Sequence, residues 1–365
     1  MSAHLPPPNS APAPARAAPV WTDPAREAAF LLWLDRESAG HGLLTDSLRA
    51  ASADASFRRY FRVDRTEGAG SCIIMDAPPA QEDCAPFVHI AALMLEAGLN
   101  VPRILAWDAP QGFMLLSDLG AQTMIEVVDR DRPQANLGLY QQAVGILVDW
   151  QRASRPGVLP AYDEALLQRE LGLFPEWYVQ RHRGLALDDT QQATLQTTFQ
   201  TLVAHNLSAP SVYVHRDFMP RNLMVGADGQ LGVLDFQDAV YGPITYDIAS
   251  LMRDAFLSWE EDFVLDITVR YWQAARKAGL PVHEDFGDFY RAVEWMGLQR
   301  HLKVAGIFAR ITLRDGKPKY LADTPRFIHY IRTTASRYRE LTPLLRLVDQ
   351  IEGTTPQVGF AYGRV

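Results

Sequence analysis

The hydrophobic positions divide the chain into two differently built parts. In the first third, short hydrophobic runs separated by turn-forming residues predict strands at Leu43–Ala50, Arg58–Asp64, Cys72–Met75, Arg103–Trp107 and Phe113–Ser117. One helical pattern precedes these runs, following Asp23 and ending near Gly40, and a second, Glu82–Ala97, lies between the third and fourth runs. Beyond Arg132, apolar residues recur every three or four positions, which predicts helices at Leu139–Ala153, Glu164–His182 and Asp188–His205, and again from Tyr246 onward. Breaks in these late helices are predicted at Gly279-Leu280-Pro281 and at Asp315-Gly316-Lys317-Pro318.

This order of elements predicts an α+β fold with two lobes. A small antiparallel sheet with one helix inserted after its third strand is followed by a larger, mainly helical region. We expect an N-lobe over residues 21–118 and a C-lobe over 119–365. Residues 1–20 are rich in Pro and Ala, so they predict a disordered leader, and their prolines interrupt the apolar run that a secretory signal requires.

Composition narrows the classes of partner. The chain has 365 residues, 48% of them hydrophobic and 21% charged, as in an ordinary globular protein. Its net charge, 35 − 43 = −8, gives no general reason to bind nucleic acid or an anionic membrane. The two cysteines, Cys72 and Cys84, resemble neither a disulfide framework nor a metal site, which favours a cytoplasmic location. No obligatory protein partner is implied.

The residues with the strongest chemical signal follow a short strand. His215-Arg216-Asp217 is followed by Asn222, and thirteen residues later Asp235 comes at the end of the strand-like run Leu231–Leu234. Phosphoryl transfer requires a carboxylate that aligns and deprotonates a hydroxyl, together with oxygen ligands for Mg²⁺ on the nucleotide phosphates. We therefore predict Asp217 as the catalytic base and Asn222 and Asp235 as Mg²⁺ ligands. His215 is expected to fix the loop through a backbone hydrogen bond.

This arrangement resembles the kinase-like phosphotransferases, and the first five strands and their helix follow the order of a protein-kinase N-lobe. A second string, Gly242-Pro243-x-x-Tyr246-Asp247, is typical of the aminoglycoside phosphotransferase-like family. The resemblance implies a protein-kinase-like bilobal fold that uses ATP and Mg²⁺, with the nucleotide bound by the N-lobe and the substrate by the C-lobe. Asp247 is expected to anchor the catalytic loop or cap its helix. Asp238 is read as a helix cap or as a further acid near the metal.

The N-lobe departs from the protein-kinase pattern in two ways. No glycine occurs between Gly42 and Gly68, where the phosphate loop is expected, and no lysine precedes Lys277. An arginine must replace the phosphate-gripping lysine, if any residue does, and Arg58 and Arg62 are expected on one strand face with Arg59 on the other. The hinge is expected at Leu115–Gly120, which otherwise reads as an edge strand ending in a turn. The nucleotide-binding candidates are Ser56, Phe57, Arg58, Arg59, Arg62, Leu116, Ser117 and Asp118.

Longer strings point to a narrower family. Residues 54–63, 75–79, 173–177 and 298–310 resemble the anomeric N-acetylmuramate/N-acetylglucosamine kinases of cell-wall recycling. This resemblance implies ATP-dependent phosphorylation of the C1 hydroxyl of one or both amino sugars, giving a sugar 1-phosphate for peptidoglycan recycling into UDP-sugars.

Four residues are candidates for binding the sugar. Glu176 and Trp177 could supply a hydroxyl-binding carboxylate and a stacking face. The lactyl carboxylate of N-acetylmuramate requires a cation, for which Arg300 and Arg310 are candidates among the basic residues of a late helix. The alternative is that Trp177 belongs to the core and that the late basic residues form a solvated face.

Two other functions stay open at this stage. The first is an aminoglycoside or other small-alcohol phosphotransferase, although a polycationic antibiotic requires a more acidic pocket than the late helices offer. The second is a non-catalytic nucleotide-binding regulator, suggested by the missing lysine. Assays with Mg-ATP and N-acetylmuramate, N-acetylglucosamine, kanamycin and choline would separate these possibilities.

Overall fold

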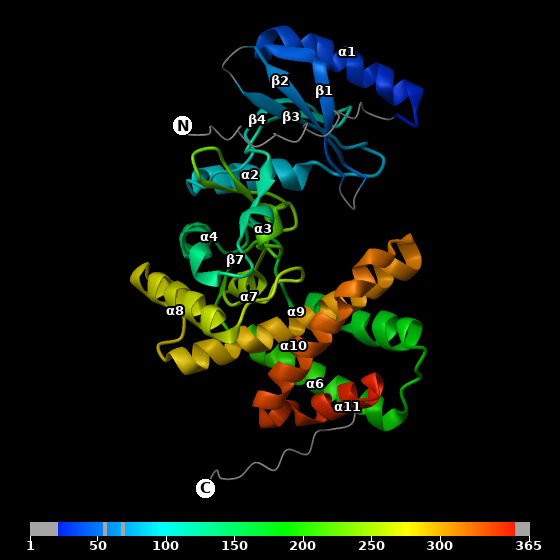
Figure 1. Cartoon of the computed structure of the whole chain (residues 1–365), viewed down its shortest axis with the longest axis vertical. Helices are drawn as coiled ribbons and strands as arrows, with labels where there is room; N and C mark the ends of the chain where they lie inside the picture. Colours follow the sequence, from blue (N-terminus) through cyan, green and yellow to red (C-terminus); the bar gives the residue numbers. More distant parts are fainter. Residues whose placement is uncertain (1–20, 54–56, 67–69, 355–365) are drawn as a thin grey trace, which may run out of the picture. The chain divides into compact units, whose positions relative to one another are not determined.

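The computed structural model describes residues 21–53, 57–66 and 70–354 and divides the chain into two compact units (Figure 1). The first unit comprises the described residues up to His89 together with residues 102–119, and the second comprises residues 90–101 and the described residues from Gly120 onward. The expected leader, residues 1–20, lies outside the described residues. The predicted α+β class, a small antiparallel sheet followed by a mainly helical region, is confirmed.

The first unit is built on a five-stranded antiparallel sheet. Its strand order is β1 (Leu43–Ala53), β2 (Arg59–Arg65), β3 (Ser71–Asp76), β5 (Phe113–Ser117) and β4 (Ile104–Asp108). Because β5 lies between β3 and β4, the interpretation of Leu115–Gly120 as the end of an edge strand is wrong.

Helix α1 (Pro24–His41) packs on the sheet through aromatic side chains. It begins after Asp23, whose carboxylate accepts the N–H of Ala25, and it ends at Gly42, which has the positive φ of 64° that glycine adopts without strain. The Phe30 ring lies 5.3 Å from the ring of Phe61 and 5.5 Å from that of Phe113. Each fully buried phenylalanine contributes about 1.5–3 kcal/mol, so this cluster fixes the helix on the sheet.

Helix α2 (Ala85–Glu96) begins three residues later than the pattern predicted. Asp83 accepts the N–H of Ala85, while Glu82 is engaged by Arg58 at 3.1 Å, so both acids precede the helix. The second half of α2 and the segment to Val101 group with the second unit. There the N–H of Val233 donates to the carbonyl of Asn100 at 2.8 Å.

The second unit contains two small sheets that hold the loops of interest. One pairs β7 (Ser211–Val214) with β10 (Val240–Pro243), and the other has the order β6 (Gln122–Thr123), β8 (Leu223–Val225) and β9 (Leu231–Val233). The predicted catalytic loop connects β7 to β8 through a short 3-10 helix, η3 (Pro220–Asn222). The predicted acidic turn connects β9 to β10.

Helices form the rest of this unit. The α-helices are α3 (Met124–Val127), α4 (Leu137–Arg152), α5 (Glu164–Leu173), α6 (Asp189–Ser208), α7 (Tyr246–Met252), α8 (Glu261–Lys277), α9 (Phe286–Asp315), α10 (Thr324–Arg337) and α11 (Thr342–Glu352). Short 3-10 segments are η1 (Pro133–Asn136), η4 (Pro318–Asp323) and η5 (Arg339–Leu341). The predicted breaks at Gly279 and at Gly316 are confirmed.

The predicted helix over Glu164–His182 is not a single α-helix. After Leu173 it widens into a π-helix, η2 (Phe174–His182). Pro175 lacks an N–H for an α-helical hydrogen bond, and the N–H of Arg183 donates to Tyr178, five residues earlier, at 2.9 Å. The proline therefore accounts for the change of helical type.

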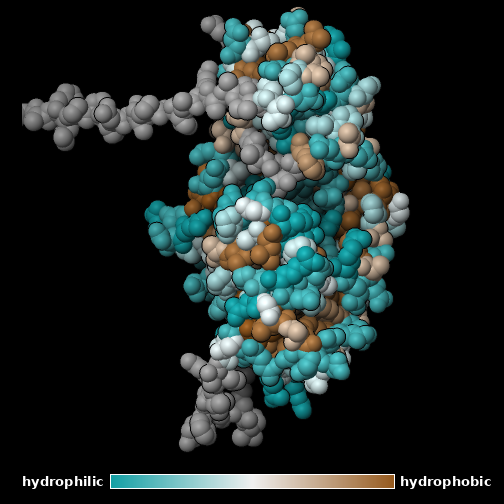
Figure 2. Space-filling view, turned by 90° about the vertical axis from the view of Figure 1, so that its right-hand side faces the viewer, coloured by the Kyte–Doolittle hydropathy of each residue, from teal (hydrophilic) through white to brown (hydrophobic). Residues whose placement is uncertain are grey.

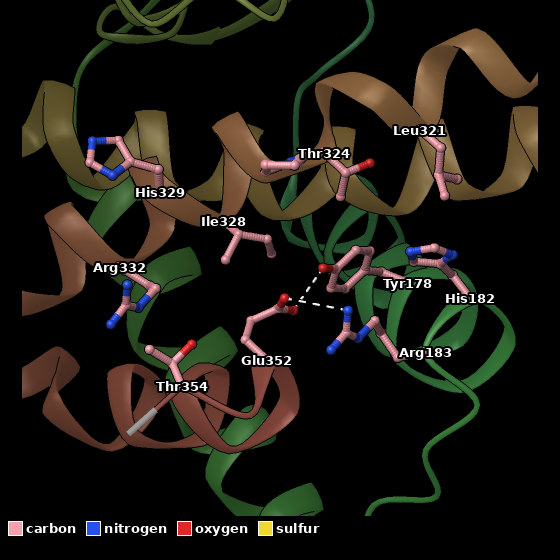
Figure 3. A pocket seen from close by; sticks show the side chains of 11 residues that line it. Tyr178, His182, Arg183, Leu321, Thr324, Ile328, His329, Arg332, Glu352 and Thr354 are labelled. Atoms are coloured by element: carbon pink, nitrogen blue, oxygen red, sulfur yellow. Dashed lines mark hydrogen bonds and ion pairs between the residues drawn. The ribbon is translucent and has the colours of Figure 1, made fainter. Parts of the chain in front are cut away.

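Two polar contacts join the π-helix to α11, the last helix among the described residues. The Tyr178 hydroxyl donates to Glu352 at 2.7 Å, and the Arg183 guanidinium lies 3.6 Å from the same carboxylate (Figure 3). These residues border a cavity of about 310 Å³, with His182 and Thr324 also in its wall. Glu352 therefore stabilises the end of η2.

On the face drawn in Figure 2, hydrophilic residues predominate and hydrophobic ones are confined to separate patches. Within the described residues, no helix has the length and apolar character needed to cross a bilayer.

Candidate active site

His215 holds the start of the catalytic loop from inside the second unit. Its side chain is 1% exposed, its Nε2 lies 2.9 Å from the carbonyl oxygen of Leu234, and its Nδ1 accepts the N–H of Asp217 at 3.2 Å. Burial lowers the pKa of His215 to about 4, so the ring is neutral at pH 7, with Nε2–H as the donor. The predicted backbone hydrogen bond of His215 is confirmed.

Asp247, on α7, anchors the same loop. Its carboxylate accepts the N–H of His215 at 2.7 Å and that of Arg216 at 3.0 Å, as one of the two sequence-based interpretations expected. The side chain is fully buried. Burial raises the pKa of its carboxyl group to about 7, although the two N–H donors act to lower this pKa. The neighbouring Gly242 is required sterically, since a Cβ there would lie 2.6 Å from the Cβ of Tyr162.

Two residues of the site have backbones that non-glycine residues rarely adopt. Arg216 has φ 76° and Asp235 has φ 62°, and they are the only non-glycine residues with positive φ in the described part of the chain. Such conformations cost about 1–3 kcal/mol each and persist only where surrounding contacts impose them. One lies directly before the predicted base, and the other is a predicted metal ligand.

Asn222 joins the predicted catalytic residues. Its side-chain amide donates to the backbone carbonyl of Asp217 at 2.9 Å and to the Asp235 carboxylate at 3.3 Å. Gln237 donates to the other oxygen of Asp235 at 2.8 Å. The structure thus brings Asp217, Asn222 and Asp235 together. Asp238 lies in a turn before β10 and caps no helix, so the helix-cap interpretation is wrong.

These side chains suit a magnesium ion. Mg²⁺ prefers a few carboxylate or amide oxygens and keeps its remaining positions for water and phosphate oxygens. The Asn222 amide nitrogen is used in the loop, which leaves the amide oxygen as a ligand, and Asp235 supplies a carboxylate. Two protein ligands are the number expected when a nucleotide supplies the others.

Sequence reasoning missed a buried polar cluster behind the loop. Glu170, on α5, accepts hydrogen bonds from Arg216 and Lys303, each at 2.8 Å, and from the Tyr162 hydroxyl. Lys303 also contacts the Tyr246 hydroxyl at 3.2 Å. The sequence offered only the basic spacing of the late helix as a signal, and nothing connected that helix to Glu170.

Arg300 lies in the same region and is 3% exposed, so it is not part of a solvated face. Its guanidinium lies over the Tyr246 ring, 5.3 Å from the centroid. Its pKa is raised above the ordinary value, despite burial, in part by the Asp217 carboxylate. Within the described residues, it has no ion pair with an acid. Arg310 is half-buried, and its Nε has no partner in the described structure.

Glu176 and Trp177 form a separate surface group on η2. Glu176 is exposed and pairs with Arg181 at 3.1 Å, while the Arg181 guanidinium stacks on Trp177 at 3.9 Å from the ring centroid. Among the described residues, no contact joins this pair to Asp217. Their predicted role in sugar binding stays a prediction.

In the first unit, each candidate arginine is ion-paired. Arg58 contacts Glu82 at 3.1 Å, Arg62 contacts Asp118 at 2.6 Å, and Arg59 pairs with the buried Asp76. Arg59 also stacks on Trp21, on the α1 face of the sheet, so Arg62 points to the opposite face as expected.

The remaining nucleotide candidates occupy the end of β5 and the segment before β2. Leu116 is buried within the sheet, and the Ser117 hydroxyl accepts the N–H of Arg103 at 2.9 Å. Phe57 is 61% exposed, with its N–H donating to Glu82. Ser56 and most of the expected phosphate loop lie outside the described residues or have undescribed side chains.

The chain is similar to known phosphotransferases over most of its length. The family model described as the phosphotransferase enzyme family matches residues 47–286. A protein of Pseudomonas putida is 50% identical over 88% of this chain and 95% of its own length, and one of Neisseria meningitidis is 50% identical over 86% and 94%. Both are named N-acetylmuramate/N-acetylglucosamine kinase.

Solved structures show the same fold at low identity. A choline/ethanolamine kinase family protein of Mesorhizobium loti has a TM-score of 0.59 and 16% identity, covering 89% of this chain and 99% of its own. An aminoglycoside phosphotransferase with ADP bound has a TM-score of 0.55 and 12% identity, covering 81% and 96%. The predicted kinase-like fold is therefore confirmed. By its family match and its relatives, the chain belongs to the phosphotransferase enzyme family.

Proposed function

We propose that this protein is an ATP-dependent kinase that phosphorylates the anomeric C1 hydroxyl of N-acetylmuramate, N-acetylglucosamine or both. Its product would be a sugar 1-phosphate used in peptidoglycan recycling, and its place of action the cytoplasm. The relatives that are half identical to it over nearly their whole length carry the name of an amino sugar kinase.

The observation that carries the proposal is the position of Asn222. The Asn222 side-chain amide donates both to the backbone carbonyl of the proposed base, Asp217, and to the carboxylate of the proposed metal ligand, Asp235. A chain that had lost catalysis would have no need to keep a base and two metal ligands in one hydrogen-bonded unit. The regulator hypothesis is therefore not favoured.

Asp217 would act on the sugar hydroxyl. Its carboxylate accepts the proton of the C1 hydroxyl as the oxygen forms a bond to the γ-phosphorus and the bond from that phosphorus to the β-phosphate oxygen breaks, releasing ADP. Within the described residues, no hydrogen bond to the Asp217 carboxylate is found, so its oxygens are available to a substrate. The loop fixes the backbone of Asp217, not its carboxylate.

Asn222 and Asp235 would hold Mg²⁺, which neutralises charge on the nucleotide phosphates when it is bound. In the first unit, Arg58, Arg62 and the backbone near Phe57 are the groups proposed to hold those phosphates. Adenine would pair with the backbone of residues 116–118. The ion pairs of Arg58 with Glu82 and of Arg62 with Asp118 keep both guanidinium groups oriented before a nucleotide binds.

The charge near Asp217 favours a neutral or anionic sugar over a polycationic antibiotic. Arg216, Arg300 and Lys303 all lie close enough to interact electrostatically with Asp217. Together with the Glu170 and Asp217 carboxylates, these three cations leave an excess of one positive charge, which would repel an aminoglycoside. They would tolerate N-acetylglucosamine and attract the lactyl carboxylate of N-acetylmuramate, for which Arg300 and Arg310 stay the proposed partners. Glu176 and Trp177 stay proposed contacts to the sugar ring.

The test is product identity. The protein is incubated with Mg-ATP and, separately, N-acetylmuramate, N-acetylglucosamine, kanamycin or choline, and the products are examined by ³¹P NMR and for acid lability. We expect an acid-labile phosphate on an amino sugar, because an anomeric ester hydrolyses readily in acid. ADP release with kanamycin or choline alone would refute the sugar assignment, and release with none of them would support a regulator.

A further inference from the structure

Glu170 connects the catalytic loop to two helices of the second unit. Its side chain, on α5, is 5% exposed and accepts hydrogen bonds from three residues: Tyr162, Arg216 and Lys303. The Arg216 and Lys303 nitrogens contact the same oxygen, Oε1, each at 2.8 Å. Arg216 directly precedes the proposed base, and Lys303 belongs to α9.

A regular contact between α5 and α9 fixes the position of Glu170. Three contacts follow one another along both helices: the Gln299 amide donates to the Leu167 carbonyl at 3.1 Å, Lys303 binds Glu170, and Gly306 lies against Leu173. Both residue numbers rise by three or four at each step, so the helices run in the same direction, one turn per contact. At Gly306 the backbones are so close that a Cβ would lie 2.4 Å from the Leu173 carbonyl.

Arg216 needs such support because of its backbone. Its φ of 76° is one of the two strained values described above, and this angle sets the direction in which the backbone enters Asp217. Asp247 holds its N–H, and the Ser250 hydroxyl lies 3.4 Å from its carbonyl oxygen. Glu170 holds its side chain, so Arg216 is held through three different groups.

The charge of Glu170 is matched to its partners. Burial alone would raise its pKa, but Lys303 and Arg216 outweigh this effect and lower it, so the carboxylate is ionised at neutral pH. Removing the negative charge would leave two partly buried cations near the Asp217 carboxylate without their shared anionic partner. Arg216 would then be drawn toward the proposed base.

We propose that Glu170 is a positioning residue for phosphoryl transfer, which acts through Arg216 to hold Asp217 in place and keeps that arginine away from the Asp217 carboxylate. This inference rests on the proposed role of Asp217. It differs from a purely structural role, in which the buried ion pair would only stabilise the packing of α5 against α9.

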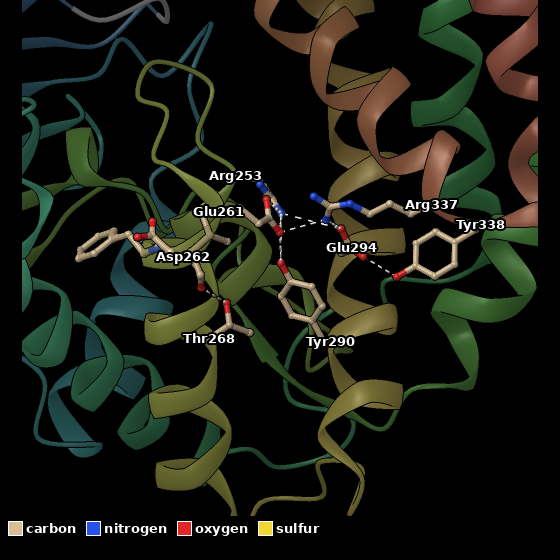
Figure 4. A network of polar contacts seen from close by, with 10 residues as sticks. Arg253, Glu261, Asp262, Thr268, Tyr290, Glu294, Arg337 and Tyr338 are labelled. Carbon is tan, nitrogen blue, oxygen red and sulfur yellow. Dashed lines mark hydrogen bonds and ion pairs between the residues drawn. The ribbon is translucent and has the colours of Figure 1, made fainter. Parts of the chain in front are cut away.

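The experiment compares Glu170→Gln with a matched control, Glu294→Gln. Glu294 is 4% exposed and lies in another buried network, where it accepts from Arg337 and Tyr338 (Figure 4). Both variants lose one buried carboxylate charge. We expect Glu170→Gln to lower kcat about 10- to 100-fold with little change in KM for ATP, as for a misplaced catalytic group. Glu294→Gln should keep kcat within about twofold.

Two further variants make the outcome decisive. If Glu170→Gln does not fold, Glu170→Gln combined with Lys303→Met removes one charge of each sign and should show the same loss of kcat. Asp217→Asn is measured in parallel. Wild-type kcat in the Glu170 variants with inactive Asp217→Asn refutes the positioning role alone, whereas near-normal turnover of Asp217→Asn refutes the proposed role of Asp217, on which the inference rests. Equal losses of kcat in folded Glu170→Gln and folded Glu294→Gln would also overturn the positioning role, because any buried carboxylate would then have the same effect.

Discussion

Asn222 and Asp235 are thirteen residues apart in the chain, yet the amide of one donates to the carboxylate of the other at 3.3 Å. Because the same amide nitrogen reaches the backbone of Asp217, one side chain defines the distance between the proposed base and the proposed metal ligand. Asn222 is therefore both a proposed ligand and a spacer between two other groups.

Asp217→Asn keeps the size of the side chain but removes its ability to accept the hydroxyl proton. We expect kcat to fall about 10²- to 10⁴-fold, while ATP binding, measured by calorimetry, is retained. Asp149→Asn is the matched control, since Asp149 is an exposed acid on α4, and it should keep near-normal kcat. Near-normal turnover of Asp217→Asn would remove Asp217 from the mechanism.

Asp235→Asn should change the magnesium requirement. An amide is a weaker ligand for Mg²⁺ than a carboxylate, so we expect the Mg²⁺ concentration for half-maximal rate to rise about tenfold or more. Gln237→Ala, which removes only the donor to Asp235 at 2.8 Å, should give a smaller shift. An unchanged Mg²⁺ dependence in Asp235→Asn would show that the ion is held elsewhere.

Alanine substitutions of Arg58, Arg59 and Arg62 should have different effects, depending on the face of the sheet on which each arginine lies. Because we propose that Arg58 and Arg62 each make a charge-assisted contact to phosphate, we expect Arg58→Ala and Arg62→Ala to raise KM for ATP about tenfold or more. Arg59→Ala removes one of the two arginine partners of the buried Asp76 and leaves Arg26 as the other. It should lower the melting temperature with little change in KM for ATP, and a large KM effect of Arg59→Ala alone would reverse this assignment.

His301 should make stability dependent on pH. Burial lowers its pKa from 6.5 to about 3, so between these values the unfolded chain binds a proton that the folded chain does not. Its stabilising effect is complete above pH 6.5 and is lost as the pH falls toward 3. Relative to His301→Gln, the wild type should lose about 3 kcal/mol of unfolding free energy between pH 7 and 4. Urea unfolding at several pH values measures this difference, and a constant difference would show a normal pKa.

Two glycines of α9 should respond to alanine with opposite signs. At Gly306 a Cβ would lie 2.4 Å from the Leu173 backbone, and we expect Gly306→Ala to destabilise the protein by about 1–3 kcal/mol. At Gly297 the nearest atom, in Arg253, is 3.6 Å away, so Gly297→Ala should stabilise the helix by up to about 1 kcal/mol. Thermal unfolding checks both, and equal effects would refute the close approach of α5 and α9.

The elements that the sequence predicted well are those determined by local chemistry. The five strands, the Asp23 cap and the breaks at Gly279 and Gly316 follow from alternation, capping and positive φ. The His215–Asn222 loop was recognisable because its residue types are adjacent in the chain. The anchoring role of Asp247 followed from a family resemblance, not from its position in the sequence.

What the sequence could not predict depends on contacts between distant segments. Glu170 reads as an ordinary helical acid until the fold places Arg216 and Lys303 beside it. The π-helix η2 has the same apolar spacing as an α-helix, and only the missing N–H of Pro175 hints at the change. Among the basic residues of α9, Arg300 is buried and Arg314 is exposed. This difference depends on which face of α9 is covered by other elements of the fold.

The anchoring of His215 and Arg216 by Asp247 has a consequence for protein design. The shape of this loop is determined by acceptors on other helices, since residues 215–222 do not provide partners for their own N–H groups at 215 and 216. Copying those eight residues into another scaffold would transfer the chemical groups without their orientation. A working graft would have to include α7 for its carboxylate and α5 for the partner of Arg216.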